Sequence, residues 1–385
     1  MTWPQVLAWR MRRQHLDPRD GLDAVEIARR LGGIQAQVAS SAEQAVAVRR
    51  AGHDGPLVAD AIADRRLIKT WAMRGTLHLL PPDEAGAYLA LIAARRTWES
   101  ASWQKAFGAT PAQVEAMAEV AGEVLADRLL TREELIAEIT DRLAAPELAA
   151  ALGSGWSALL KPLAWLGVLC QGPPQGTKVT FTSPASWAPS WQGLADVDVA
   201  ARAAVRAYLG AYGPADPAAF DAWLTRGQSR KAEVRRWFEA ASDDLITVEV
   251  AETTADPEAM ASSADAPPPG GRVAYLLAEH LDELAATQAS DVVRLLPGFD
   301  QYVLGPGTGA VELIAPHRRA LVSRPAGWIS PVVVHGGRVV GVWDPTDTHA
   351  DIRLWSDIPD EGLTHEVARW STHLGRALDA QTSRI

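Results

Sequence analysis

Apolar residues recur every three or four positions along most of residues 1–290, which is the spacing of helices that bury one face. The stretch "LDAVEIARRLGGIQAQ" (22–37) follows this pattern as far as Leu31, and the pair Gly32-Gly33 then predicts a helix end and a turn. The stretches "SAEQAVAVRRA" (41–51) and "PLVADAIADRRLI" (56–68) are helical by the same criterion. The chain therefore begins as a series of short helices.

The pattern changes at "LIKTWAMRGTLHLLP" (67–81). Its threonine, tryptophan and leucine residues favour a pair of strands, with Arg74-Gly75 as the turn between them. Alternation would place Arg74, Thr76 and His78 on one face of a strand. Several helices followed by a short hairpin are typical of a winged helix, a variant of the helix-turn-helix.

The same order of elements recurs as a pattern, although the cycles share negligible sequence identity. In the second cycle, Thr131 followed by Glu134 predicts a capped helix start. An apolar helix over 153–172, which contains Cys170, then precedes a strand in "TKVTFTSPASW" (177–187). This cycle is a second winged helix.

The third cycle has helices after residue 196, followed by the strands "LITVEVAE" (245–252) and "RVAYLL" (272–277). Residues 252–271 between these strands are rich in Pro, Ala, Ser and Asp. We expect them to form a flexible excursion between two strands of a wing.

The last hundred residues contain strand patterns and one closing helix. Strands are expected in "VVRLLPGFDQYVLG" (292–305), "HRRALVS" (317–323), "GWISPVVVHGGRVVGVWDP" (327–345) and "ADIRLWS" (350–356), and a helix over 362–380. The pair Gly336-Gly337 predicts a hairpin turn, because glycine readily adopts positive φ. A small β-sheet or β-barrel fits this region.

Together these patterns predict an α+β fold that is mostly helical. Three tandem winged-helix motifs precede a small C-terminal β-barrel or sheet. The expected boundaries are 1–105, 106–195, 196–290 with the flexible insertion, and 291–385 for the β-barrel-like region and terminal helix.

The composition excludes several classes of protein. No run of about 18 apolar residues predicts a membrane span, and the start of the chain lacks the features of a signal peptide, so we expect a cytoplasmic, nucleoid-associated protein. The single cysteine, Cys170, cannot form an internal disulfide and is expected to be a buried small apolar residue. Cysteine and histidine are too sparse and scattered for a zinc site, and the motifs HExxH, CxxC and GxSxG do not occur.

The net charge of −10 argues against a nucleic-acid partner, but only weakly, because a basic face needs only local clustering. Four basic clusters suggest that acidic and basic residues are segregated on different faces. The clusters are Arg10, Arg12 and Arg13; Arg65, Arg66 and Lys69; Arg226, Arg230, Lys231, Arg235 and Arg236; and Arg318, Arg319 and Arg324. A solvated helix face is the alternative interpretation of each cluster.

Winged helices usually bind duplex DNA, but they also mediate contacts between proteins. The pattern therefore leaves a transcriptional regulator, an interaction scaffold and an enzyme acting on DNA open. The pair Gln35 and Gln37 does not decide between them, because two glutamines at a helix end can simply cap backbone groups.

Four segments carry a resemblance to a known family. "GGIQAQ", "TWAMRGTLHLL", "LLPGFDQYVLG" and "VVVHGGRVVGVW" together resemble the winged-helix DNA glycosylases of the AlkZ/YcaQ type, and the likeness runs through essentially the whole chain. The resemblance implies a C-shaped clamp with a basic concave face. It also implies excision of N7-alkylated purines and unhooking of interstrand crosslinks, without a metal or cofactor.

The family's catalytic motif is glutamine, an apolar residue, then glutamine or aspartate. This chain has Gln35-Ala36-Gln37, the form that ends in glutamine and is found in the branch that gives self-resistance to DNA-crosslinking antibiotics of the azinomycin kind. The resemblance therefore implies a monofunctional glycosylase of DNA repair in which Gln37 orients a water and Gln35 positions the substrate. Its partner would be double-stranded DNA with N7-alkylpurine or crosslink lesions, with no membrane and no obligate protein partner.

The expected DNA contacts lie mainly around the first wing. They are Arg65, Arg66, Lys69, Arg74, Thr76 and His78, together with Arg230 and Lys231 in the third cycle. Asp300 and Tyr302 are possible residues of the cleft, although a structural role is at least as good an interpretation. A non-catalytic DNA-binding regulator, or a guard that binds adducts without cleaving them, remains the alternative function.

Overall fold

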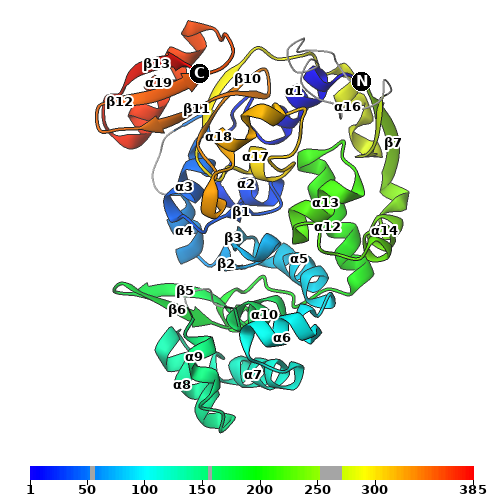
Figure 1. The fold of residues 1–385 in the computed structure, drawn as a ribbon, viewed down its shortest axis with the longest axis vertical. Helices are drawn as coiled ribbons and strands as arrows, with labels where there is room; N and C mark the ends of the chain where they lie inside the picture. The colour runs from blue at the N-terminus through cyan, green and yellow to red at the C-terminus, as the bar shows by residue number, and fades with distance from the viewer. Residues whose placement is uncertain (53–56, 155–157, 252–270) are drawn as a thin grey trace.

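The computed structural model describes residues 1–52, 57–154, 158–251 and 271–385. Figure 1 shows most of the N-terminal elements in the middle of the molecule and the first helix near the top. The second group of helices lies below them, the third group at one side and the C-terminal sheet above. Helices and strands are mixed throughout, which confirms the α+β class.

The first group contains the predicted helices and the predicted strand pair. Its elements are α1 (Trp3–Arg13), α2 (Ala24–Arg30), β1 (Ile34–Gln35), α3 (Ala39–Ala47), α4 (Leu57–Ala63), β2 (Ile68–Trp71) and β3 (Leu77–Leu80). Strand β3 pairs with β2 on one side and with β1 on the other, antiparallel in both cases. The short strand β1 was not predicted, because two residues carry no periodic signal.

The second group continues the same sheet. Its elements are α5 (Pro82–Ala94), α6 (Ala101–Phe107), α7 (Pro111–Val124), β4 (Leu130–Thr131), α8 (Arg132–Arg142), α9 (Leu148–Leu152), α10 (Leu160–Trp165), β5 (Cys170–Gln175), β6 (Lys178–Thr182) and α11 (Pro184–Trp187). The strand order is β1-β3-β2-β5-β6-β4, so the hairpins of the first two groups form one sheet.

The predicted capping box at Thr131 is confirmed, because the Thr131 hydroxyl accepts a hydrogen bond from the Glu134 amide at 3.3 Å. Cys170 is fully buried as predicted, but it begins β5 and does not lie in a helix. Helix α10 ends before it, because Gly167 adopts a left-handed conformation with φ of 74°.

The third group consists of four α-helices and a hairpin among the described residues. Its elements are α12 (Val197–Tyr212), α13 (Pro217–Thr225), α14 (Lys231–Ala240), β7 (Leu245–Val250), β8 (Arg272–Leu277) and α16 (Leu281–Ala286). The antiparallel pairing of β7 with β8 confirms both predicted strands. The flexible excursion expected over 252–271 falls, except for Gly271, outside the described residues.

The C-terminal group forms an open sheet. Its elements are β9 (Val293–Leu296), α17 (Gln301–Leu304), α18 (Arg319–Val322), β10 (Val332–His335), β11 (Arg338–Pro345), β12 (His349–Leu354), α19 (Asp360–Leu374) and β13 (Asp379–Arg384). The strand order is β13-β12-β11-β10-β9, and the outer strands do not pair with each other, so these described residues do not close a barrel. Gly336 and Gly337 turn the β10–β11 hairpin at φ of 55° and 82°, which confirms the predicted turn.

Two strand predictions in this region were wrong. Residues 317–323 lie in a short 3₁₀ turn and in α18, and residues 301–304 form α17. Asp300 starts α17 by accepting a hydrogen bond from the Tyr302 amide at 2.8 Å. A short apolar run has no periodicity that separates one helical turn from a strand.

Helix α1 packs between distant parts of the chain. Trp3, Val6 and Trp9 share a hydrophobic cluster with residues of β7, β8 and α16, whereas Leu7 and Met11 pack into the core of the C-terminal sheet. The first helix therefore joins the third group to the C-terminal group.

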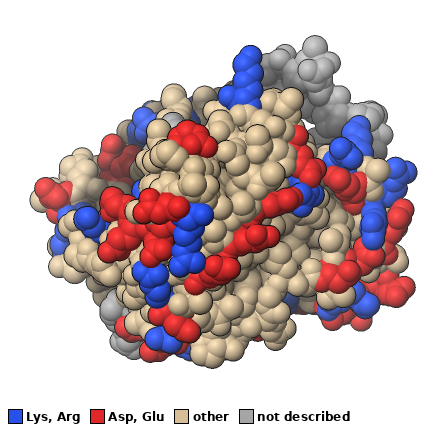
Figure 2. All heavy atoms as spheres, turned by 90° about the horizontal axis from the view of Figure 1, so that it is seen from below, with Lys and Arg blue, Asp and Glu red and all other residues tan. Residues whose placement is uncertain are grey.

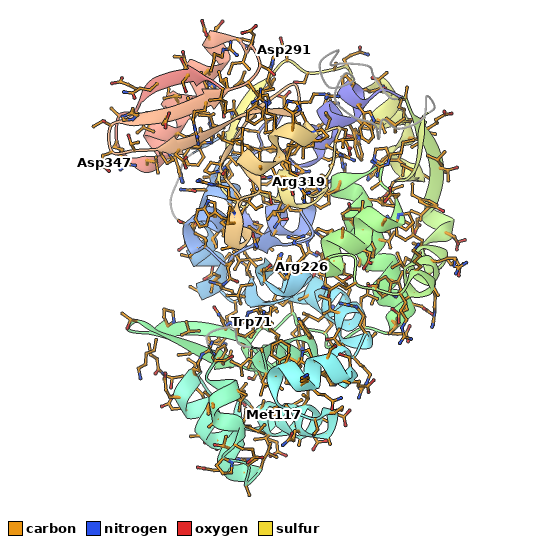
Figure 3. All side chains as sticks on the ribbon, viewed as in Figure 1. Trp71, Met117, Arg226, Asp291, Arg319 and Asp347 are labelled. Atoms are coloured by element: carbon orange, nitrogen blue, oxygen red, sulfur yellow. The ribbon has the colours of Figure 1, made fainter. Side chains whose placement is uncertain are left out.

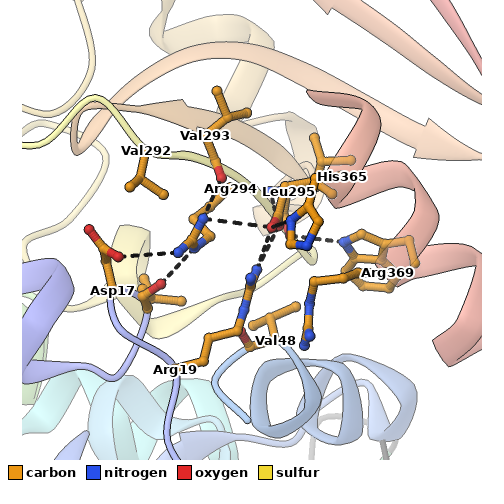
Figure 4. A network of polar contacts seen from close by, with 12 residues as sticks. Asp17, Arg19, Val48, Val292, Val293, Arg294, Leu295, His365 and Arg369 are labelled. Atoms are coloured by element: carbon orange, nitrogen blue, oxygen red, sulfur yellow. Dashed lines mark hydrogen bonds and ion pairs between the residues drawn. The ribbon is translucent and has the colours of Figure 1, made fainter. Parts of the chain in front are cut away.

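A buried carboxylate fastens α19 to the N-terminal part of the chain (Figure 4). Glu366, which is 1% exposed, accepts two hydrogen bonds from Arg19 Nη2, at 2.6 and 2.7 Å, and one from the Leu295 amide at 3.2 Å. Arg294 lies 3.7 Å from the same carboxylate and also approaches Asp17. The hydrogen bonds from Arg19 and Leu295 and the nearby charge of Arg294 thus compensate the buried Glu366 carboxylate for its lost hydration.

Acidic and basic side chains are intermingled at the end of the molecule formed by the second group (Figure 2). Arg96 pairs there with Glu115, Arg128 with Glu138, and Lys178 with Glu133. The charge segregation expected from the sequence is therefore not seen on this face. No helix among the described residues is both long and apolar enough to cross a membrane.

Candidate active site and DNA interface

The path of the backbone brings the Gln35-Ala36-Gln37 stretch against the first wing. Helix α2 ends at Leu31, and Gly32 and Gly33 reverse the chain at φ of 62° and 107°. A Cβ on Gly33 would lie only 2.6 Å from a methyl carbon of Leu80 in β3. The second glycine is therefore required both by its conformation and by its close approach to the wing.

The two glutamines differ sharply in their surroundings. Gln35 lies in β1, is only 7% exposed, and its Oε1 has no hydrogen-bond partner among the described residues. Gln37 is exposed, and its Oε1 accepts a hydrogen bond of 3.4 Å from the Leu77 amide. The neighbouring Ala36 amide donates to the Leu77 carbonyl at 2.8 Å, which fixes this segment beside the wing. Gln37 is thus anchored and still accessible to a ligand.

A row of polar side chains crosses the sheet behind Gln37. In the register of the sheet, Gln35 lies opposite His78, and His78 lies opposite Thr70, so the three side chains share one face. His78 is fully buried, and its Nδ1 lies 3.0 Å from the Thr76 carbonyl, to which it donates. Burial and the nearby Arg74 charge lower the pKa of His78 to about 3. His78 is therefore a neutral interior residue that cannot contact DNA.

The expectation that Arg74, Thr76 and His78 lie on one face of a strand was wrong. Arg74 lies in the turn that precedes β3, at φ of 58°, and confirms the predicted turn at Arg74-Gly75. Its Nη1 donates to the Trp223 carbonyl at 3.0 Å, and burial lowers its pKa to about 10. Thr76 is half-buried and donates its hydroxyl hydrogen to the Met73 carbonyl at 3.2 Å.

Lys69 faces away from this row. It precedes Thr70 in β2, so its side chain emerges on the opposite face of the sheet from Gln35 and His78. Burial lowers the pKa of Lys69. The structure therefore does not bring this amine to the same face as the buried glutamine.

The remaining predicted cations are spread over two regions. Arg65 is exposed and stacks on Trp187 with its guanidinium carbon 4.4 Å from the ring centroid, and Arg66 forms an ion pair of 2.5 Å with Asp23. Arg230 and Lys231 are exposed at the start of α14 in the third group. Lys231 lines a separate cleft of about 1370 Å³ between α13, α14 and β7.

Asp300 and Tyr302 lie in the interior and do not line an open cleft. Arg49 at the end of α3 donates two hydrogen bonds of 2.7 Å to the Asp300 carboxylate, and neither side chain is exposed to solvent. The Tyr302 hydroxyl donates to the Gly337 carbonyl at 2.7 Å. Both residues thus make contacts within the folded interior.

The sequence did not lead us to predict Arg49 as the partner of Asp300. It follows Ala42, Ala45 and Val46 at helical spacing, on the face of α3 that packs into the core. A charged residue on an apolar helix face indicates that it has a buried partner of opposite charge. The pattern does not indicate which residue that partner is.

The site as described can position groups but offers little acid–base chemistry. Its exposed member is a neutral amide, which can accept a hydrogen bond and donate another but cannot remove a proton at neutral pH. The described residues also contain no group of three or more His, Cys, Asp or Glu side chains that could hold a metal ion. Such a site suits a substrate that is already activated.

Comparison with known proteins identifies similar chains over the full length. The family model described as DNA glycosylase AlkZ-like matches residues 28–384. A protein of Streptomyces sahachiroi described as an interstrand DNA cross-link repair glycosylase is 45% identical over 380 residues, which cover 98% of this chain and 96% of the relative. The solved structure of Streptomyces sahachiroi DNA glycosylase AlkZ superposes with a TM-score of 0.92 at 44% identity, covering 100% of both chains. The resemblance inferred from the four sequence segments is thus confirmed.

Proposed function

Because this chain belongs to the AlkZ-like family of DNA glycosylases, enzymes that cleave N-glycosyl bonds, we propose that it hydrolyses the N-glycosidic bond of N7-alkylated purines in duplex DNA. Gln37 orients the attacking water, and Gln35 helps to position the substrate. The observation that carries the proposal is the placement of Gln37, exposed to a ligand and anchored to the Leu77 amide.

The chemistry of the substrate explains why a neutral amide suffices. Alkylation at N7 gives the purine a positive charge, so the base leaves as a neutral molecule and needs no proton from an acid. The sugar develops positive charge as the bond breaks. The protein then has to orient a water and direct a negative dipole toward the sugar, which a glutamine carbonyl can do.

Helix α3 supplies an anchor for the DNA backbone immediately after Gln37. The helix begins at Ala39, its N-cap Val38 offers no side-chain acceptor, and its first turn contains no acidic residue. The unsatisfied N–H groups and the helix dipole favour an anion at this end. A phosphate bound there would hold the sugar of the neighbouring nucleotide close to Gln37.

The surroundings also favour a monofunctional enzyme. A lyase reaction needs an amine that attacks the sugar, and Lys69 lies on the opposite face of the sheet from Gln35. His78 is neutral and buried, so it neither protonates the leaving base nor attacks the sugar. Water is therefore the proposed nucleophile.

The exposure of Gln37 fits lesions that are too bulky to enter a closed pocket. The Streptomyces relative is described as an enzyme of interstrand cross-link repair. We extend this role to the present chain and propose that it unhooks crosslinks formed by an azinomycin-like natural product, giving self-resistance. A C-shaped clamp built from three winged helices is the corresponding proposal for how the duplex is held.

The test uses three duplexes that differ only in one base. The first contains N7-methylguanine and the second an azinomycin-type crosslink. The third contains uracil, a base without a positive charge. Base release is followed as alkali-induced strand cleavage. We expect release from the two cationic lesions and a rate for uracil lower by a factor of about 10³ or more, because the site has no acid to assist a poor leaving group. DNA binding without release from any lesion would contradict the proposal and support a regulator or an adduct-binding guard.

A further inference from the structure

A further cleft is lined by the turn between β2 and β3, close in sequence to the Leu77 amide that holds Gln37. It has a volume of about 550 Å³ and is bordered by the turn Ala72–Gly75, the end of α5, α6, α10 and the loop after α13. Figure 3 shows Arg226, from that loop, near the middle of the molecule where the helix groups meet. The cleft therefore adjoins the candidate active site without containing either glutamine.

The lining of this cleft carries four cations and, among its described residues, no carboxylate. Arg74 and Arg95 donate to backbone carbonyls, those of Trp223 and Gln228. Arg95 also interacts with the charges of Asp221 and Glu233, which do not line the cleft. Lys161 and Arg226 form no side-chain ion pair with any residue that the structure describes. Burial lowers the pKa of Lys161, and the Arg226 charge adds a smaller repulsive contribution in the same direction. An anion would relieve this repulsion.

Two buried N–H donors of the lining also lack acceptors. Trp165 Nε1 and Arg74 Nη2 are inaccessible to solvent and have no hydrogen-bond partner within the described ranges. Buried donors are nearly always paired in folded proteins, so unpaired donors that border a cleft favour a ligand rich in acceptor oxygens. A phosphate group has these properties.

Two aromatic rings also line the cleft. Trp103 and Phe107 of α6 lie with ring centroids 5.0 Å apart, and Phe107 is 37% exposed. Cations that track a phosphate backbone beside exposed aromatic rings are the combination that binds unpaired nucleotides, because every base can stack on a ring.

We propose that this cleft, which we call the α6–α10 cleft, binds one unpaired nucleotide through its phosphate and base. Given the proposed function, this nucleotide comes from the DNA strand beside the lesion. The segment that links the cleft to the anchor of Gln37 is short, since Thr76 separates the lining residue Gly75 from Leu77, which holds Gln37. If the cleft bound a nucleotide displaced from its place beside the lesion, the duplex would stay open at the lesion.

The test measures affinity for undamaged DNA by fluorescence anisotropy. One duplex is fully paired, and the other carries a single-nucleotide bulge of the same sequence. We expect the wild type to bind the bulged duplex about tenfold more tightly, in line with stacking of one base. The double variant Lys161→Ala/Arg226→Ala should lose this preference. The control variant Arg12→Ala/Lys105→Ala removes two exposed cations outside the cleft and should keep the preference, even if both affinities fall.

A second titration separates the two sources of a nucleotide. A deoxynucleoside 5′-monophosphate is added while the fluorescence of the tryptophans is recorded. Mononucleotide binding that requires Lys161 and Arg226, without a preference for the bulge, would assign the cleft to free nucleotides and overturn the DNA source. Equal affinities of the wild type for both duplexes, together with no mononucleotide binding, would overturn the proposal entirely.

The outcome is independent of the glycosylase test. Release of N7-methylguanine without a bulge preference would overturn only the role of the α6–α10 cleft. A bulge preference without base release would contradict only the proposed reaction.

Discussion

Gln35 and Gln37 have the same side chain but very different surroundings. Gln37 is exposed and anchored through a single long hydrogen bond, so its amide can turn toward a water. Gln35 is buried, and its Oε1 and the Nε2 of the facing His78 both lack partners among the described residues. An unsatisfied buried polar atom costs about 1–3 kcal/mol. Such a cost is tolerated mainly where a function requires it.

The buried histidine predicts how stability depends on pH. In the unfolded chain His78 has its ordinary pKa of 6.5, and in the folded chain its pKa is about 3. Between these values the unfolded state binds more protons, so the free energy of unfolding rises with pH and the contribution of His78 is complete above about pH 6.5.

We therefore expect the variant His78→Gln, which cannot titrate, to show a shallower fall in stability below pH 6.5 than the wild type. The measurement is urea denaturation at a series of pH values, with slopes compared between the two proteins. Identical slopes for His78→Gln and the wild type would contradict the neutral buried state of His78.

At the scale of elements, the glycine turn between α2 and β1 sets the position of both glutamines. Gly33 combines a left-handed backbone with contact to Leu80 and Met73, which belong to the wing. The turn therefore couples the end of α2 to the hairpin against which Gln37 is anchored. No other residue fits both requirements.

Gly33→Ala should destabilise the protein by about 2–4 kcal/mol, from the left-handed backbone and the clash of the new methyl group. It should also lower base release at temperatures where the protein is still folded, because β1 must move away from β3. The control is Gly309→Ala, where the added methyl group meets no atom within 4 Å. Denaturation midpoints and base-release rates of the two variants provide the comparison. An unchanged midpoint for Gly33→Ala would contradict the packing described for this turn.

Sequence patterns identified the strongly periodic elements well, including the strand pairs β2–β3 and β7–β8, strand β6 and the hairpin at Gly336-Gly337. They missed strand β5, whose first residues lie in the predicted helix over 153–172. They failed at short apolar runs such as α17 and α18, where one helical turn and a strand look alike. The pattern also placed Arg74 in a strand with His78, although its left-handed conformation keeps it in the turn. The spacing of apolar residues along the chain does not reveal where the backbone reverses its direction.

At the scale of the whole molecule, contacts between distant segments decide which candidate residues face a ligand. His78 is fully buried. Asp300 pairs with Arg49, which follows α3 and lies 251 positions earlier in the chain. Neither the burial of His78 nor the pairing of Asp300 with Arg49 can be predicted from the spacing of residues along the sequence. The glutamine stretch was identified because the family's motif includes it, and its exposure became known only from the fold.

Long-range pairs of this kind also hold the groups of elements together. Helix α1 packs against both the third group and the C-terminal sheet, and Glu366 ties α19 to Arg19. Removing one partner of a buried ion pair typically costs about 3–5 kcal/mol. The scaffold around the glutamines is therefore fixed by contacts far from them in sequence.

In the proposed reaction an exposed neutral amide, Gln37, orients the attacking water. The most direct measurement is the single-turnover rate of N7-methylguanine release by the wild type, Gln37→Ala and Gln381→Ala, the last being an exposed glutamine on β13. We predict a fall of about a hundredfold for Gln37→Ala, because water is no longer oriented, with DNA affinity little changed. Gln381→Ala should equal the wild type. A Gln37→Ala rate equal to that of the wild type would contradict the account.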